Sequence, residues 1–111
     1  MKMGKRFRTI VREYIARNYK EPFALNIPIF IRLNSRGFFD YYDPVEKIGG
    51  SGTLQGLQNR FREIYRCGNC NGYHVPGVID LTDPEKPVKY LFYEFLNLTE
   101  EQYQQRLRGR K

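Results

Sequence analysis

The amino-acid sequence predicts one small α+β domain, in which a sheet packs against helices. Three observations predict it: an apolar stripe with helical spacing near the N-terminus, a strand-like alternation after it, and a helix-capping signature near the C-terminus. The 111 residues, of which 41% are hydrophobic and 15% aromatic, suit a single domain spanning 1–111 with a modest core. We expect three or four strands in a mostly antiparallel sheet.

Residues 5–20 are predicted to form an amphipathic N-terminal helix. Its apolar residues recur at helical spacing, and they are Phe7, Ile10, Val11, Tyr14 and Ile15. Lys5, Arg8 and Arg12 fall on another side of the same helix, and Pro22 ends the helical pattern. The helix should therefore bury one face and present a basic face to the solvent.

A β-hairpin is predicted next. Apolar side chains occupy every second position of residues 25–33, which is the period of a strand with one buried face. The turn residues 34–37 and the aromatic stretch 38–42 follow, so the chain is expected to return as a second strand. Because Pro28 has no N–H for a sheet ladder, we expect the first strand at an edge of the sheet.

Residues 43–53 are rich in glycine and are predicted to form a loop before a second helix at 53–66. Ser51 or Thr53 is expected to cap the start of that helix. The backbone N–H groups of the loop offer an alternative role, which is to bind an anion at the helix N-terminus. We favour the capping interpretation, because the loop lacks the lysine of a phosphate-binding loop.

Two further strands and a short helix complete the predicted domain. Residues 75–81 are expected to form a short strand, and residues 88–96 a longer one. The longer strand is expected to be central, because apolar or aromatic side chains occupy both of its faces. Thr99 and Gln102 match a capping box, which predicts a helix from 100 to about 108.

The chain carries a net charge of +7, and all of the excess lies at its two ends. Residues 1–20 have a net charge of +6, residues 106–111 have +4, and residues 21–105 have −3. A basic N-terminal helix and a basic C-terminal tail on a near-neutral body indicate contact with an anionic surface. The expected partner is a nucleic acid, RNA or DNA, or else an anionic protein surface.

The candidate nucleic-acid-binding residues belong to the two basic ends and to the hairpin. They are Lys5, Arg8, Arg12, Arg32, Arg36, Tyr41, Tyr42, Arg106, Arg108 and Arg110. Guanidinium and ammonium groups bind phosphates, and tyrosine rings stack on unpaired bases. The competing interpretation is that the hairpin aromatics, Phe30 and Phe38 included, divide between the core and ordinary sheet surface.

Cys67, Cys70 and His74 are the only cysteines and the only histidine of the chain. A structural zinc takes four such ligands, and these residues supply three. A thioredoxin-type redox pair would begin a helix, whereas this pair follows one. Gly68 and the nearby asparagines favour a helix end and a turn, so we expect no cofactor, with zinc at the three residues as the alternative.

The residue pattern contains no complete catalytic set, and we expect a non-catalytic protein. The favoured function is a small basic nucleic-acid-binding or ribonucleoprotein-associated module that binds through its basic ends and the aromatic hairpin. The alternative is a small protein-binding factor, such as a virus- or phage-encoded inhibitor or assembly component. A metal-dependent hydrolase is third, since the fold could bring Asp40 and Asp43 close to Asp80 and Asp83.

The sequence also indicates a compartment. Residues 1–20 carry charges throughout and contain no apolar region of a signal peptide. No run reaches the roughly 18 apolar residues of a membrane span. Two cysteines without a secretory signal suit a reducing compartment, so we expect a cytoplasmic protein with no membrane partner.

Overall fold

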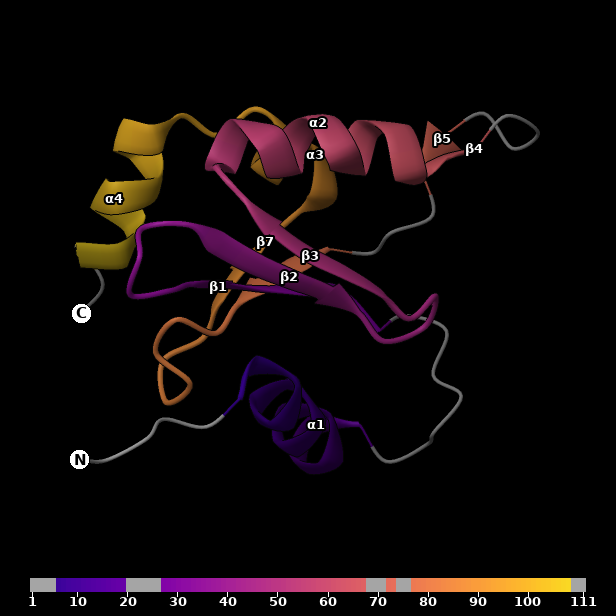
Figure 1. The fold of residues 1–111 in the computed structure, drawn as a ribbon, viewed down its shortest axis with the longest axis vertical. Helices are drawn as coiled ribbons and strands as arrows, with labels where there is room; N and C mark the ends of the chain where they lie inside the picture. The colour runs from indigo at the N-terminus through magenta and orange to yellow at the C-terminus, as the bar shows by residue number, and fades with distance from the viewer. Residues whose placement is uncertain (1–5, 20–26, 68–71, 74–76, 109–111) are drawn as a thin grey trace.

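The computed structural model describes residues 6–19, 27–67, 72–73 and 77–108, and they form a sheet with helices on both faces (Figure 1). The helices are α1 (Phe7–Asn18), α2 (Leu54–Ile64), α3 (Phe92–Leu96) and α4 (Glu100–Arg108). The strands are β1 (Ile29–Leu33), β2 (Phe39–Asp43), β3 (Ile48–Gly52), β4 (Arg66–Cys67), β5 (Gly72–Tyr73), β6 (Val78–Asp80) and β7 (Val88–Tyr90). The α+β class is confirmed, and the main sheet has five strands rather than three or four.

The five-stranded sheet has the order β3-β2-β1-β6-β7, while β4 and β5 pair separately. Neighbouring strands of the main sheet are antiparallel, except that β1 and β6 run parallel. A parallel pair needs a crossover connection, and α2 lies in the segment of chain between β1 and β6. The prediction of a mostly antiparallel sheet is therefore confirmed.

The prediction that the first strand lies at an edge is wrong, because β1 is the central strand. Ile29, Phe30 and Ile31 are all buried, so both faces of β1 are covered. Pro28 immediately precedes the strand and takes no part in its ladder. The first N–H of the strand is that of Ile29, which donates to the carbonyl of Gly77 at 3.1 Å. The proline therefore marks where the central strand begins.

The prediction of a glycine-rich loop over 43–53 is wrong for residues 48–52, which form the edge strand β3. A tight turn precedes it, in which the Asp43 carboxylate accepts the N–H groups of Val45 and Glu46. Lys47 adopts a positive φ of 61° in this turn. The returning chain then pairs with β2 along its whole length, from Ile48 opposite Asp43 to Gly52 opposite Phe39. Pairing with β2 holds the glycines in strand geometry despite their low intrinsic preference for it.

The prediction of a long central strand over 88–96 is also wrong. The strand β7 ends at Tyr90 and lies at an edge of the sheet, and the helix α3 follows. The Glu94 carboxylate accepts the backbone N–H of Leu91, which satisfies a donor at the start of this short helix. Phe92 and Phe95 then lie near Phe61 of α2, with ring centroids 6.4 and 5.7 Å from it. Helical spacing lets both rings face α2, which a strand would not allow.

The other predicted helices are confirmed within one or two residues of their expected ends, whereas the strands predicted at 25–33 and 75–81 are shorter, because β1 begins at Ile29 and β6 at Val78. α1 buries Phe7, Val11 and Tyr14. Thr53 caps α2, since its hydroxyl accepts the N–H of Gly56 at 3.0 Å. The capping box of α4 is complete: Thr99 accepts the N–H of Gln102, and Gln102 accepts the N–H of Thr99. In the described part of the chain, no helix has the length and apolar character needed to cross a membrane.

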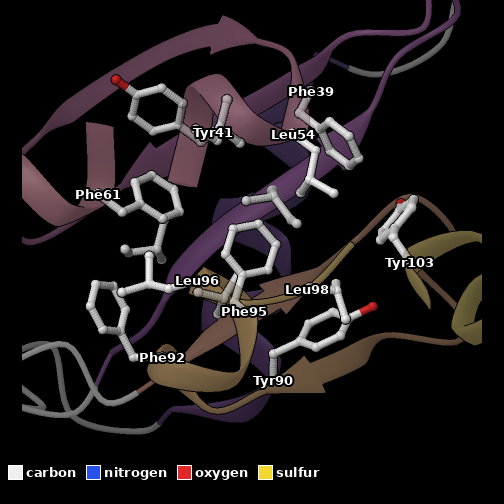
Figure 2. Close-up of a cluster of buried hydrophobic side chains, with 14 of the residues drawn as sticks. Phe39, Tyr41, Leu54, Phe61, Tyr90, Phe92, Phe95, Leu96, Leu98 and Tyr103 are labelled. Atoms are coloured by element: carbon white, nitrogen blue, oxygen red, sulfur yellow. The ribbon is translucent and has the colours of Figure 1, made fainter. Parts of the chain in front are cut away.

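The core has two parts, one on each face of the sheet. The larger part lies between the sheet and α2, α3 and α4, and Figure 2 shows its aromatic side chains converging. Tyr103 fixes α4 to this part, because it is fully buried with its ring 4.9 Å from that of Phe39. The smaller part lies under α1, where the rings of Tyr14 and Phe30 meet at 5.5 Å.

A buried amide joins α2 to the segment between α3 and α4. The Gln58 side chain is only 7% exposed. Its Nε2 group donates to the carbonyl oxygens of Phe95 and Leu98, at 2.9 and 2.7 Å. Both acceptors are backbone groups of the chain that leads from α3 into α4, so this one side chain positions both short helices against α2.

We expect Gln58→Ala to reduce the free energy of unfolding by about 2 kcal/mol, because it removes two buried hydrogen bonds. Gln55→Ala is the matched control, since Gln55 is an exposed residue of the same helix. Urea denaturation followed by circular dichroism measures both variants. A loss for Gln58→Ala no larger than that for Gln55→Ala would contradict the assigned role of the buried amide.

Candidate nucleic-acid interface

The described residues form a shallow recess of about 440 Å³ between α1 and the strands β2 and β3. We name it the arginine recess, because Arg6, Arg8 and Arg12 line its helical side. Arg6 is the residue that precedes α1, and Arg8 and Arg12 are four residues apart on the helix. Side chains at this spacing are neighbours on one helix face. The three guanidinium groups therefore line the same recess.

The recess is open because α1 covers only part of its face of the sheet. The apolar side of α1 packs mainly on β1 and β6, through Phe30 and Ile79. At the edge strand β3, Gly49, Gly50 and Ser51 remain exposed. The sheet thus continues beyond the helix and forms a floor with almost no side chains. Figure 1 shows α1 alone on this face, with α2 on the other.

Tyr42 lies at the centre of the recess, where it is half-buried and contacts Arg8. The Arg8 guanidinium carbon is 4.7 Å from the centre of the Tyr42 ring, which is a cation–π contact. Gly49 makes this arrangement possible. A Cβ atom at position 49 would lie 3.1 Å from the Tyr41 carbonyl oxygen and 3.2 Å from a Tyr42 ring carbon. Any side chain there would therefore make tight contacts, and the Tyr42 ring or the Tyr41 backbone would have to shift slightly.

Asp40 is the one carboxylate that lines the recess, and its charge is already matched. It accepts hydrogen bonds from Arg32 at 2.9 Å, Ser51 at 2.7 Å and Asn34 at 3.3 Å. Burial raises the pKa of Asp40, but these hydrogen bonds and the Arg32 charge outweigh burial and lower its pKa. Asp40 is therefore ionised at neutral pH, and Arg32 balances it.

Among the residues that the structure describes, no carboxylate neutralises the charge of the recess arginines. Within the described residues, Arg6, Arg8 and Arg12 form no ion pair with a carboxylate. The cation–π contact of Arg8 leaves its positive charge in place. The recess therefore combines three uncompensated guanidinium groups, one aromatic ring and an exposed strand backbone. This combination suits a ligand with several negative charges and at least one flat group.

Tyr41 lines the recess, but its side chain points to the other face of the sheet, which corrects its assignment as a base-stacking residue. Successive side chains of a strand point to opposite faces, so Tyr41 and Tyr42 cannot share one. Tyr41 is 4% exposed and packs edge-on against Phe61 of α2. Its hydroxyl accepts a hydrogen bond from Arg60 at 2.7 Å. Phe30 is fully buried as well, beneath α1.

The remaining candidate residues lie apart from the recess. Arg36 is exposed in the β1–β2 turn, close in the chain to Phe38, which is 46% exposed. Arg106 forms an ion pair with Glu94 and lies 5.1 Å from the Tyr90 ring centre. Arg108 is exposed at the end of α4. Since α1 and α4 pack on opposite faces of the sheet, the described arginines of α1 and those of α4 lie on different faces.

Lys5 and Arg110 lie outside the described residues, as do Cys70 and His74. Cys67 lies in β4, which pairs with β5 so that Cys67 is opposite Gly72. α2 ends at Ile64, two residues before the expected position, and a short antiparallel pair follows it. The zinc alternative at Cys67, Cys70 and His74 therefore remains a prediction.

The four aspartates of the hydrolase hypothesis are not gathered into a cluster. Asp40 faces α1, whereas the buried Asp43 accepts a hydrogen bond from Tyr65 on the other face. Asp80 is buried and accepts hydrogen bonds from Thr82. Across the ranges that the structure describes, no three metal-binding side chains of the His, Cys, Asp and Glu types come together.

Comparisons of the chain with protein-family models, with curated proteins and with solved structures found no match. The functional argument therefore depends on the geometry and chemistry of the arginine recess.

The lowered pKa of Asp40 predicts how its contribution to stability depends on pH. Because the folded-state pKa is below the ordinary value of 3.8, the ionised carboxyl stabilises the fold above that pH. The stabilisation disappears as the pH falls through the folded-state pKa. We expect Asp40→Asn to cost about 1 kcal/mol at neutral pH, through loss of its charge-assisted bonds. The cost should be smaller at an acidic pH below 3.8 than at neutral pH.

Urea denaturation of the native protein and the Asp40→Asn variant at both pH values measures this difference. Glu85→Gln serves as the control, because it removes one exposed carboxylate that does not line the recess. A cost for Asp40→Asn that stayed constant between the two pH values would contradict the assigned pKa direction.

Proposed function

We propose that this protein is a small, non-catalytic nucleic-acid-binding module, and that the arginine recess is its principal contact surface. The observation that carries the proposal is the set of three guanidinium groups, Arg6, Arg8 and Arg12, which form no ion pairs among the described residues. Guanidinium groups bind phosphates through paired hydrogen bonds, and they do so better than ammonium groups. A polyphosphate backbone is the ligand that offers these arginines several such partners at once.

The packing of α1 determines where the basic side chains of the recess lie. α1 packs on the sheet through Phe7, Val11 and Tyr14, so its basic side is turned outward. A disordered basic arm would lose conformational entropy on binding, whereas a packed helix has already lost that entropy on folding. The arginines therefore present a preorganised cationic surface beside the exposed edge of β3.

The C-terminal end is proposed as a second, weaker contact. Arg106 is held by Glu94, so Arg108 is the exposed cation of α4 within the described residues that has no carboxylate partner. Because α4 packs on the face opposite α1, a ligand has to extend around the sheet to reach both ends. A polymer can do so, whereas a small anion cannot.

A protein-binding role is the second candidate, and one observation favours it. Leu91 and Tyr93 are 69% and 57% exposed at the start of α3, away from the arginine recess. Tyrosine is enriched at the energetic centres of protein interfaces. A partner protein docked there would leave the recess free, so Leu91→Ser with Tyr93→Ser would abolish its capture and spare nucleic-acid binding.

Nucleic-acid binding should depend strongly on salt, and Arg8→Ala with Arg12→Ala should weaken that dependence. Each lost phosphate contact flattens the slope of log affinity against log salt by about 0.7 to 0.9, so the double variant should flatten it by about 1.4 to 1.8. Fluorescence anisotropy with a labelled oligonucleotide over a salt series measures the slope. The fold should persist, because neither residue belongs to the buried side of α1.

The control for this double variant is Arg17→Ala with Lys86→Ala. It changes the net charge by the same amount at two exposed positions that do not line the arginine recess. The control should leave the slope near that of the native protein. If both double variants flattened the slope equally, general positive charge would explain the binding, and the recess would have no special role.

Deletion of residues 107–111 tests the second contact. Leu107 packs against the larger core cluster but is only partly buried, and the buried Tyr103 remains in place. The shortened protein should therefore stay folded and show a smaller salt slope, by at least one phosphate contact of about 0.7 to 0.9. An unchanged slope, with an unchanged melting temperature, would remove the C-terminal end from the proposed interface.

A further inference from the structure

The size of the arginine recess limits which form of nucleic acid enters it. Its volume of about 440 Å³ lies within the range of small-ligand pockets, which is roughly 300 to 1,000 Å³. The bases of a double helix are paired and stacked inside it, so a duplex can offer this open recess only its backbone. The recess has room for one or two unpaired nucleotides, whose bases are accessible.

Arg8 supplies a surface on which an unpaired base can stack. Arg8 is an exposed residue, and its guanidinium carbon lies over the Tyr42 ring, 4.7 Å from the ring centre. Guanidinium planes and aromatic rings are both used to stack unpaired bases. The tyrosine restricts the otherwise flexible arginine, and Gly49 leaves the room for the tyrosine. A base on Arg8 would thus add to the cation–π contact that Arg8 already makes with Tyr42.

The floor of the recess allows close approach of a sugar–phosphate backbone. Gly49, Gly50 and Ser51 offer no side chain longer than a hydroxymethyl group, and all three are exposed. β3 is an edge strand, so its outer backbone groups lack a strand partner. Glycine in a strand is often found where a ligand comes close to the backbone. Arg6 and Arg12 flank this floor from the helical side.

We propose that the arginine recess selects single-stranded over double-stranded nucleic acid, with one unpaired base stacked on Arg8 and the adjoining phosphates bound by Arg6 and Arg12. This inference rests on the proposed nucleic-acid-binding function and adds the class of ligand. It assigns different roles to two neighbouring arginines: Arg8 stacks on a base and also contacts the phosphate of that nucleotide, whereas Arg12 contacts only phosphate.

The experiment compares a labelled single-stranded oligonucleotide with the same strand annealed to its complement, at one fixed salt concentration. Fluorescence anisotropy measures both affinities for the native protein. We expect the single strand to bind more tightly by about 5- to 150-fold, which is the effect of one stacked base.

Two conservative variants separate stacking from charge. Arg8→Lys keeps the charge but loses the planar group, so it should lose most of the preference for the single strand. Arg12→Lys keeps the charge at a position assigned to phosphate alone, so its preference should stay close to that of the native protein. Tyr42→Phe keeps the supporting ring and should also keep the preference, whereas Tyr42→Ala should lose it. Circular dichroism melts verify that each variant is folded.

Each result has a defined meaning. Equal affinity for both forms would overturn the inference and leave the proposed function in place. A preference that survived Arg8→Lys would overturn the stacking role of Arg8. Failure to bind either form at low salt would overturn the proposed function itself. If a poly-glutamate peptide bound as tightly as the single strand, charge alone would explain binding at the recess, and the inference would be overturned.

Discussion

The burial of β1 on both faces is the constraint on which the rest of the structure depends. Ile29 and Ile31 belong to the larger core, whereas Phe30 belongs to the part under α1. Two faces must therefore be covered, and a chain of 111 residues has few helices with which to do so. Of the described helices, α2, α3 and α4 cover one face and α1 covers the other. A single helix does not reach the outer strands, and the exposed part of β2 and β3 becomes the arginine recess.

Side chains of β2 alternate between the two faces of the sheet, so adjacent residues of this strand have different functions. Tyr41 stabilises the larger core and bonds to Arg60, while Tyr42 lies in the recess beneath Arg8. Asp40 is on the same side as Tyr42 and is paired with Arg32. The side of β2 that faces α1 thus combines an aromatic ring with a neutralised carboxylate. An unpaired carboxylate in that place would oppose the binding of any anion.

Local patterns in the sequence predicted α1, α2 and α4 and the capping residues Thr53 and Thr99, because these depend on neighbours within one or two turns. These local patterns failed where contacts with residues distant in the sequence determine the secondary structure. Pairing with β2 extends the glycine-rich 48–52 as a strand, and packing on Phe61 turns 92–96 into a helix. Arg8 and Arg12 were found by helical periodicity. The misassignment of Tyr41 was avoidable, since two successive strand residues cannot share a face. The role of Gly49 could not be predicted from the sequence, because it depends on the tertiary position of the Tyr42 ring.

The position of Asp40 shows why a basic surface can include a carboxylate without losing its preference for anions. Asp40 accepts hydrogen bonds from Arg32 of β1, from Asn34 of the turn after β1, and from Ser51 of β3. It therefore links three consecutive segments of the sheet. Arg32 in turn lies over the Phe7 ring, 5.2 Å from its centre, at the start of α1. The pair therefore orients the helix that carries Arg8 and Arg12 relative to the strand that carries Gly49. Because the two charges of the pair cancel at distances beyond their separation, the field of the recess is set by the three unpaired arginines.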